Sequence, residues 1–330
     1  MSFPKQSNFL LAILLTLFMS FSIQAQDTLP YYPSPSWSPD GNKLAVVVDT
    51  TVEIYDATTM DLLFILADHT ASLPSIVWSP DGSMLATPSY DQTIKIWDTQ
   101  NGILLHTLIG HDDALTMAIW MPDGEALITS AVESNPSLFR WDTQDWRLSL
   151  VSEAGSVTGA IFNPENTQLA LMTPCSLSIR DVNTLDNALS TPHDSWCTSE
   201  KYELDWSPDG IYLATGSVNG LVEIWDATTL QVVRELHVNP YFAEDPFTIT
   251  DLALSWVRDV RFSTDSQTVL AISGDGTINE WDIATGELLS EINLEETITS
   301  VAFSPSNDRI AYTTSQGAIE VIPNPFINHP

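Results

Sequence analysis

The sequence predicts an all-β fold, a seven-bladed β-propeller of four-stranded antiparallel blades, and two interleaved series of residues support this. In the first series, an aromatic residue followed by a turn sequence recurs at intervals of 41 to 56 residues. In the second, a residue usually followed by Asp comes 18 to 21 residues after each member of the first. The first series is Trp37, Trp78, Trp120, Phe162, Trp206, Phe262 and Phe303. The second is Tyr55, Trp97, Trp141, Arg180, Trp225, Trp281 and Ile322. A period of this length is typical of repeat architectures.

Each period contains the signals of four short strands. In the second, an apolar run at Ser75–Trp78 precedes Ser79–Gly82, whose sequence Ser-Pro-Asp-Gly suits a type I turn. Two runs rich in β-forming residues follow, Met84–Thr87 and Thr93–Trp97, separated by a tight turn. The Asp after the aromatic residue starts another turn, which leads to Ile103–Leu108. Four strands at this spacing predict one small antiparallel sheet.

One such sheet cannot bury both of its faces, so neighbouring sheets must stack. Seven sheets in a ring satisfy this requirement and leave only short edges. We therefore expect a single domain over residues 26–330. The last blade is the uncertain one, because the tail after Ile322 is short and proline-rich. It is either three-stranded or completed by Gln26–Tyr32.

The charge balance excludes several classes of function. The chain has 43 acidic residues and 11 Lys or Arg residues, for a formal net charge of −32. Nucleic-acid binding needs a basic surface, and so does attraction to anionic lipid headgroups. The scarcity of cations favours a basic or neutral partner.

Residues 1–25 have the pattern of a secretory signal. Lys5 precedes an apolar run from Phe9 to Ile23, and Ala25 is a small residue at a possible cleavage point. The run of 15 residues is shorter than the roughly 18 expected of a spanning helix. We expect a secreted, periplasmic or cell-envelope protein that is not inserted in the membrane once the signal is removed. We also expect a monomer. The alternative for residues 1–25 is an uncleaved membrane anchor.

The repeats resemble those of the WD-repeat family of β-propellers, over about Trp37 to Ile322. The Trp-Asp endings and a Gly-His pair at Gly110 carry the resemblance, although exported propellers with a Ser-Pro-Asp-Gly repeat are also similar. The resemblance implies a structural hydrogen-bonded tetrad of His, Ser/Thr, Asp and Trp in each complete blade. The second and sixth blades would carry it as His69, Ser89, Asp91 and Trp97, and as His237, Ser273, Asp275 and Trp281.

Other blades match this tetrad only in part. The fifth has His193, Ser217 and Trp225, with Asn219 in place of Asp. The third keeps His111 and Trp141, with a turn lengthened through Glu133 to Pro136. Blades one, four and seven lack the His and the Trp, so we expect them to be softer.

No nucleophile elbow, phosphate-binding loop or zinc-protease motif occurs in the sequence. The expected inner strands place Glu203, Asp205 and Asp259 among Arg258 and Arg261. This group is either an internal ion-pair patch between blades five and six or a carboxylate site for a divalent cation. The second interpretation would make the protein a secreted propeller hydrolase or lactonase. We predict a scaffold with no cofactor and no catalysis, which binds protein or peptide through its top face and rim.

An insertion of about 14 residues, within 238–256, lies between the fifth and sixth blades. Its aromatic residues either recognise a partner or fold back over the two blades. The candidate binding residues are Trp196, Tyr241, Phe242 and Phe247. Surface tryptophans such as Trp146 leave carbohydrate binding as a further possibility.

The only two cysteines, Cys175 and Cys197, fall on loops of the same expected face. In an exported protein we predict a disulfide between them, worth about 3 kcal/mol in the chain-entropy account. Two free thiols are the alternative.

Overall fold

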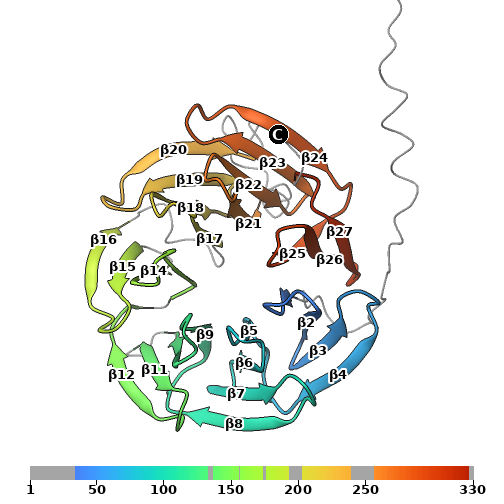
Figure 1. Ribbon diagram of the computed structural model, residues 1–330, viewed down its shortest axis with the longest axis vertical. Helices are drawn as coiled ribbons and strands as arrows, with labels where there is room; N and C mark the ends of the chain where they lie inside the picture. The colour runs from blue at the N-terminus through green and yellow to red at the C-terminus, as the bar shows by residue number, and fades with distance from the viewer. Residues whose placement is uncertain are drawn as a thin grey trace, which may run out of the picture.

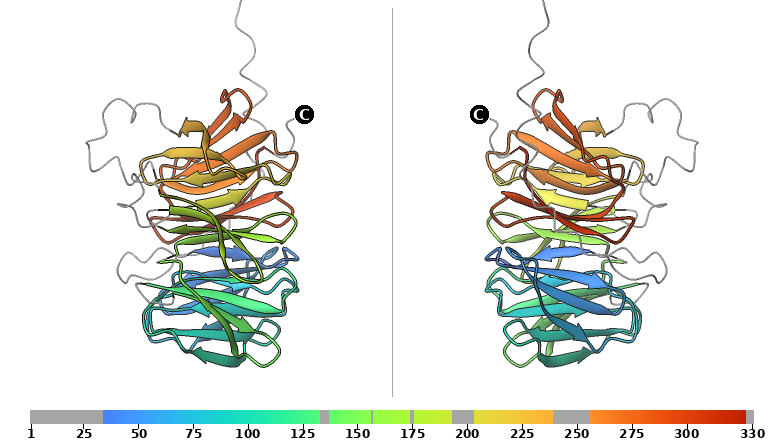
Figure 2. Two further views of the ribbon diagram at one scale, coloured as in Figure 1. Left: turned by 90° about the vertical axis from the view of Figure 1, so that its left-hand side faces the viewer. Right: turned by 90° about the vertical axis from the view of Figure 1, so that its right-hand side faces the viewer.

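The computed structural model describes residues 34–132, 137–155, 157–173, 176–192, 203–238 and 256–326. Their strands form seven antiparallel sheets around a central opening (Figure 1). The edge-on views in Figure 2 show the sheets stacked as the blades of a flattened ring. The predicted all-β, seven-bladed propeller is confirmed.

The first four blades follow the chain in order, and in each the strands run from the central opening outward. Blade one is β1 (Pro35–Trp37), β2 (Lys43–Val48), β3 (Thr51–Asp56) and β4 (Leu62–Ala67). Blade two is β5 (Val77–Trp78), β6 (Met84–Pro88), β7 (Thr93–Asp98) and β8 (Leu104–Ile109). Blade three is β9 (Leu115–Trp120), β10 (Ala126–Ala131), β11 (Leu138–Asp142) and β12 (Leu148–Ser152). Blade four is β13 (Gly159–Phe162), β14 (Gln168–Thr173), β15 (Ser176–Asp181) and β16 (Asn187–Pro192).

The last three blades complete the ring. Blade five is β17 (Glu203–Trp206), β18 (Tyr212–Gly216), β19 (Leu221–Asp226) and β20 (Val232–His237). Blade six is β21 (Val257–Phe262), β22 (Thr268–Ser273), β23 (Thr277–Asp282) and β24 (Leu288–Asn293). Blade seven has three strands in the described part of the chain, β25 (Ile298–Phe303), β26 (Arg309–Thr314) and β27 (Ile319–Pro323). The segment 26–32, considered above as a fourth strand, lies outside the described residues.

The turn between the first two strands of a blade has the predicted chemistry. In blade one the Ser38 hydroxyl donates to Asp40 (Oγ to Oδ1, 2.6 Å) and accepts the Lys43 backbone N–H at 2.9 Å. Gly41, the fourth residue of the turn, has a φ of 68°. This left-handed conformation favours glycine because a Cβ atom would be strained there. At the corresponding position of blades four, six and seven, a non-glycine residue adopts a similar φ, namely Asn166, Ser266 and Asn307.

The Asp that ends the third strand starts the next turn, also as predicted. The Asp56 carboxylate accepts the backbone N–H groups of Thr58 (2.8 Å) and Thr59 (2.9 Å). Asp181 and Asp226 make the same pair of bonds in blades four and five. These acids therefore shape turns, which accounts for part of the acid excess.

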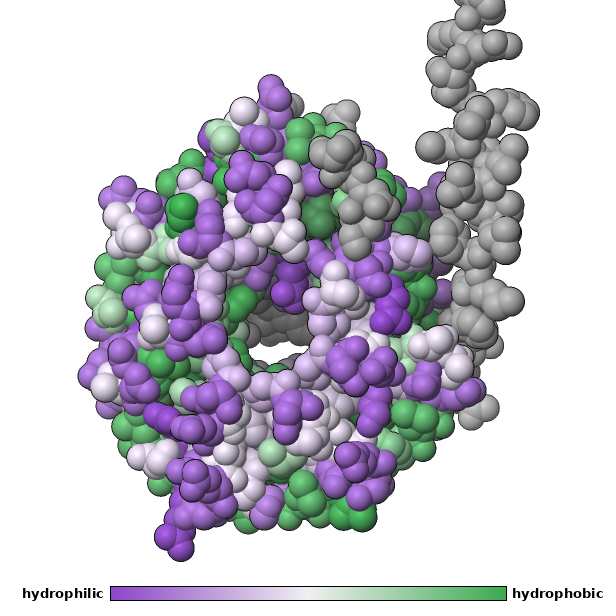
Figure 3. Space-filling view, viewed as in Figure 1, coloured by the Kyte–Doolittle hydropathy of each residue, from purple (hydrophilic) through white to green (hydrophobic). Residues whose placement is uncertain are grey.

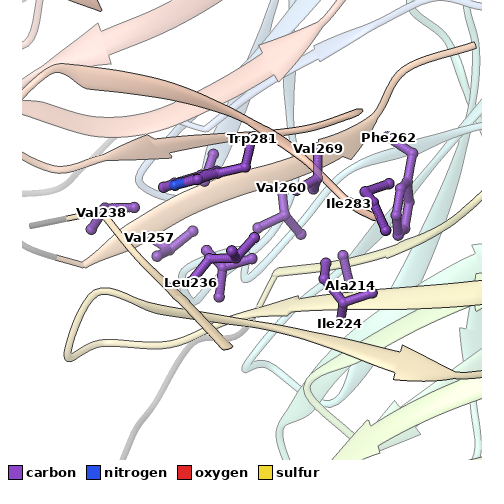
Figure 4. Close-up of a cluster of buried hydrophobic side chains, with 12 residues drawn as sticks. Ala214, Ile224, Leu236, Val238, Val257, Val260, Phe262, Val269, Trp281 and Ile283 are labelled. Carbon is purple, nitrogen blue, oxygen red and sulfur yellow. The ribbon is translucent and has the colours of Figure 1, made fainter. Parts of the chain in front are cut away.

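The hydrophobic core lies between blades. Figure 4 shows one such layer, in which Leu236 and Ile224 of blade five meet Val260 and Trp281 of blade six. Tryptophans at the ends of inner strands add bonds to the preceding blade. The Trp78 indole N–H donates to the Ser36 carbonyl at 3.2 Å. Burial and these directed bonds together fix each blade against the next.

The ring closes by the same kind of contact between blades seven and one. The Trp37 indole N–H donates to the Ala302 carbonyl at 3.1 Å. The Arg309 guanidinium lies over the Trp37 ring, 4.4 Å from its centroid, and donates to the carbonyls of Ala57 (3.0 Å) and Gly41 (2.8 Å). One arginine thus joins the two ends of the repeat array.

The surface separates polar and apolar regions. Figure 3 shows a largely hydrophilic face around the central opening, with hydrophobic residues toward the rim. The outer strands carry most of the exposed large apolar side chains, among them Leu63, Ile109 and Leu289. Within the residues that the structure describes, no helix has the length and hydropathy needed to cross a membrane.

Candidate functional site

The polar network of blade two is the most complete in the described residues. The Nδ1 atom of His69 lies 2.7 Å from Oδ2 of Asp91. Its Nε2 atom lies 2.8 Å from Oγ1 of Thr87, which also accepts the Trp97 indole N–H at 2.9 Å. With Nδ1–H donating to Asp91, Nε2 accepts the Thr87 hydroxyl proton. A single directed chain therefore runs from Trp97 to Asp91 through the blade.

Burial and hydrogen bonding fix the charge states in this chain. Burial lowers the pKa of His69 below its ordinary value, so the imidazole is neutral near pH 7. Burial acts to raise the pKa of Asp91, but hydrogen bonds from Thr93, Thr70 and His69 outweigh it and bring the pKa to about 2. The network is thus a neutral imidazole held by a carboxylate, and the Thr87 hydroxyl is hydrogen-bonded on both sides. That is a structural arrangement, as the resemblance implied for the tetrad.

Sequence reasoning assigned the hydroxyl of this network to the wrong residue. Ser89 donates to the Ala71 carbonyl (2.9 Å) and accepts the Asp91 backbone N–H (3.1 Å), so it shapes the adjoining turn. Thr87, two residues earlier on β6, makes the bridging contacts. The sequence contained a usable signal, because Thr recurs at the same place on the second strands of blades three and five, as Thr129 and Thr215.

Blade three has the same Trp–Thr–His arrangement on its described residues. Oγ1 of Thr129 lies 2.7 Å from Nε2 of His111 and accepts the Trp141 indole N–H at 2.9 Å. The His111 ring stacks on Phe139, with centroids 4.0 Å apart. Its Nδ1 atom is buried and has no hydrogen-bond partner among the described residues. Burial accordingly lowers the pKa of His111 to about 4.

Blades five and six depart further from the expected tetrad. In blade five the Trp225 indole N–H donates to Thr215 (3.0 Å), whereas His193 lies outside the described residues. In blade six the predicted tetrad is wrong. His237 is an exposed residue at the end of β20, with no hydrogen bond to Asp275, and Ala271 occupies the position of the bridging Thr. Ser273 and Asp275 bond each other at 2.6 Å and shape a turn instead.

The charged residues of the inner strands come together between blades five and six. The Asp205 carboxylate is buried and accepts the Phe262 backbone N–H at 2.8 Å. Arg261 lies between the acids, with Nη1 3.8 Å from Asp205 and Nε 3.5 Å from Asp259. Burial raises the pKa of Asp259 to about 6, although Arg261 opposes the shift, and it raises that of Asp205 in the same sense. Arg258 stacks on Trp256, 4.8 Å from the ring centroid.

These acids line a cavity of about 570 Å³ at one end of the central opening. The wall also includes Glu203 and aromatic side chains from four blades, and it ends at the turns that join first to second strands. The aromatic residues are Trp37, Trp206, Phe262 and Phe303. Within the described residues, no group of three or more His, Cys, Asp or Glu side chains is arranged to hold a metal ion. The geometry that the structure does show here is an ion-pair cluster linking two blades.

Several predicted site residues fall outside the described part of the chain. They are the candidate binding residues Trp196, Tyr241, Phe242 and Phe247, and the predicted disulfide partners Cys175 and Cys197. The aromatic and disulfide predictions therefore stay predictions. Trp146 packs edge-on against Trp120, with ring centroids 5.8 Å apart, and so belongs to the contacts of the core.

The fold and the Trp–Thr–His networks define a propeller of the WD-repeat class, and comparison with known families agrees. Residues 60–98, 182–226 and 250–282 match the WD domain, G-beta repeat family. Each of these segments ends at or beside a Trp-Asp pair of the repeat. Over these three segments the chain is similar to WD-repeat proteins.

Similar curated proteins come from varied contexts. The chain is 34% identical to Protein tipD of Dictyostelium discoideum over 28% of its own length and 16% of that protein. It is 26% identical to eukaryotic translation initiation factor 3 subunit I of Drosophila grimshawi, over 47% of this chain and 45% of the relative. It is 23% identical to the serine-threonine kinase receptor-associated protein of Gallus gallus, over 54% of this chain and 46% of the relative. The matched region spans less than half the length of each relative.

Proposed function

We propose that the protein is an exported scaffold that binds a basic protein or peptide through its top face and the adjoining rim, with no catalytic step of its own. The top face is the one that carries the connections between second and third strands and those between consecutive blades. The strand order of the sheets defines it, because every blade is an antiparallel meander.

The charge of this face is the observation that carries the proposal. The described connections of the top face expose several acids, and none of their described residues is Lys or Arg. These exposed acids are Asp49, Asp68, Asp112, Glu153, Glu295 and Glu296. Lys95, which reaches toward this face from β7, is buried and paired with Asp68. A surface of one sign attracts and orients partners of the opposite sign.

The fold and the relatives support a scaffold. A closed ring of interlocked blades holds its loops on a rigid base, which is where binding residues commonly lie. One relative is named for association with a receptor and another as a subunit of a translation factor. Export is an independent part of the proposal, because it depends on residues 1–25, which lie outside the described residues. Cell fractionation with and without that segment tests it.

Binding of labelled peptides to the full chain tests the proposal about the face. A lysine-rich, a neutral and a glutamate-rich peptide of equal length are compared by fluorescence anisotropy at two salt concentrations. We expect the lysine-rich peptide to bind most tightly and to lose affinity at high salt. The double change Asp112→Lys and Glu296→Lys should abolish this binding.

A matched control carries Glu125→Lys and Glu287→Lys, which are exposed on the opposite face. The control should keep most of the binding. Equal losses in the two variants would mean that the peptide responds only to net charge, and the top face would then have no special role.

A further inference from the structure

A second cavity, of about 280 Å³, lies between blades three and four, away from the central opening. The connection after β12 forms one wall, and the outer strands β15 and β16 form the other. Figure 1 shows these two blades as neighbours in the ring. The residues that line the cavity are Glu153, Ala154, Gly155, Ser176, Ser178, Arg180, Asn187 and Ser190.

The cavity occurs where the structural network of the other blades is missing. In blade two Leu85 pairs with Trp97, and in blade four Leu169 pairs with Arg180, so Arg180 takes the place of the network tryptophan. By the same register Leu171 takes the place of Thr87. Ser176, Ser178 and Arg180 occupy every second position of β15, so they share one face and small side chains lie beside the arginine. Arginine and serines do not fill the space that a bulky indole and its partners fill elsewhere.

Arg180 is an unusual group to find in such a place. The residue is 7% exposed, so its guanidinium is largely buried. Nη1 donates to the Leu185 carbonyl (2.8 Å) and the Ser152 hydroxyl (3.3 Å), and Nη2 donates to the Glu153 carbonyl (2.8 Å). Nε has no hydrogen-bond partner, and within the described residues no carboxylate lies at ion-pair distance. A buried cation with no carboxylate in direct contact is energetically costly.

We propose that this cavity binds a small hydroxylated carboxylic acid of the sugar-acid class. The carboxylate supplies the direct ion pair that Arg180 lacks, since guanidinium and carboxylate form strong charge-assisted hydrogen bonds. The hydroxyls of the ligand pair with Ser176, Ser178, Ser190 and Asn187, whose side chains can both donate and accept. The volume equals that of about nine waters, which suits a monosaccharide-sized ligand.

Nearby acids set the affinity rather than exclude the ligand. The exposed Glu153 lines the cavity, and Asp186 acts on Arg180 through its charge. The remaining negative charge of the chain is largely screened beyond about 8–10 Å at physiological salt. Removing the Glu153 charge should therefore tighten binding of an acid and leave binding of a neutral sugar unchanged.

Isothermal titration of the full chain with D-glucuronate tests the proposal, with D-glucose and acetate as matched probes and ionic strength held constant with NaCl. Glucose lacks the carboxylate, and acetate lacks the hydroxyls. We expect glucuronate to bind at least tenfold more tightly than either probe. Glu153→Gln should raise the glucuronate affinity about threefold.

Two variants address the cavity itself. Arg180→Met should weaken glucuronate binding by about 10- to 100-fold, the effect of losing hydrogen bonds to a charged group. Because Arg180 is buried and its replacement could unfold the blade, Ser190→Phe provides a second route. Ser190 is exposed, so this change blocks the cavity and leaves the core intact. Thr107→Phe, at the same strand position in blade two, is the control and should leave binding unchanged.

Several results would overturn the proposal. Equal binding of glucose and glucuronate would remove the role of the guanidinium. Equal effects of Ser190→Phe and Thr107→Phe would place any binding elsewhere. No heat with any of the three probes at millimolar concentration would show that the cavity does not take this class of ligand.

Discussion

Replacing Thr87 with Val removes one hydroxyl from the middle of the blade-two network and keeps the shape of the side chain. The Thr87 side chain is fully buried, and its Oγ1 lies 2.8 Å from His69 Nε2 and 2.9 Å from Trp97 Nε1. The change removes two hydrogen bonds and leaves a buried donor on Trp97 and a buried acceptor on His69. Each unsatisfied buried group costs about 1–3 kcal/mol, so for two groups we expect the free energy of unfolding to fall by about 2–6 kcal/mol.

Chemical denaturation followed by tryptophan fluorescence and circular dichroism measures this loss. A lower midpoint with an unchanged slope would report a loss of stability and not a change in the unfolded state. Thr107→Val is the control, because Thr107 is exposed on β8 and its replacement should change the stability by no more than about 0.5 kcal/mol.

A double-mutant cycle with Trp97→Phe isolates the contact itself. Thr87→Val and Trp97→Phe should together cost less than the sum of their separate effects, because the second change removes a bond that the first has already broken. A loss for Thr87→Val within the range of the Thr107→Val control would refute the reasoning. It would mean that the network is ordered by the fold but does not stabilise it.

Three further predictions follow from buried or bridging charges. The pKa of His111 is about 4 in the folded state and about 6.5 in the unfolded chain, so the unfolded chain takes up a proton first as the pH falls. The free energy of unfolding should therefore fall by up to about 3 kcal/mol between pH 6.5 and pH 4. His111→Gln should reduce this pH dependence, measured by acid denaturation. The pH dependence that Asp259 contributes to stability has the opposite sign. Its folded pKa of about 6 lies above the unfolded value, so the folded state binds the proton first as the pH falls. Asp259→Asn should therefore raise the free energy of unfolding at pH 7 more than at pH 4. Arg309→Met should lower the free energy of unfolding by about 2–3 kcal/mol, because it removes two hydrogen bonds to carbonyls between blades seven and one. The control in the same denaturation experiment is Arg147→Met, which should lower it by less than about 0.5 kcal/mol because Arg147 is exposed.

Much of the fold could be predicted because its signals are local and repeated. The Ser-Pro-Asp-Gly turns and the Asp after each third strand make bonds within five residues along the chain, so the sequence pattern is sufficient to place them. The bridging Thr87 was missed for a different reason. Its partners His69 and Trp97 lie on other elements, and only the strand register shows which hydroxyl faces them.

The ring closure and the two cavities could not be predicted in this way. Arg309 contacts a carbonyl 268 residues earlier in the sequence, and nothing near it marks that partner. The sequence did show Arg180 at the position of a network tryptophan. It could not show that the surrounding space stays open, because that depends on side chains contributed by the preceding blade.

The same register position can serve either stability or binding, and the hydrogen bonds decide which. In blade two the network uses the polar side-chain atoms of Thr87, His69 Nε2 and the Trp97 indole N–H, so no donor remains for a ligand. In blade four the guanidinium keeps a buried, unpartnered Nε, and the Arg180 side chain lines a cavity of about 280 Å³. In blade four the missing network is therefore replaced by a polar site, at the cost of a buried charge that a bound anion can neutralise by direct contact. Because each blade is supported on both sides by its neighbours, the ring tolerates one such substitution without losing its closure.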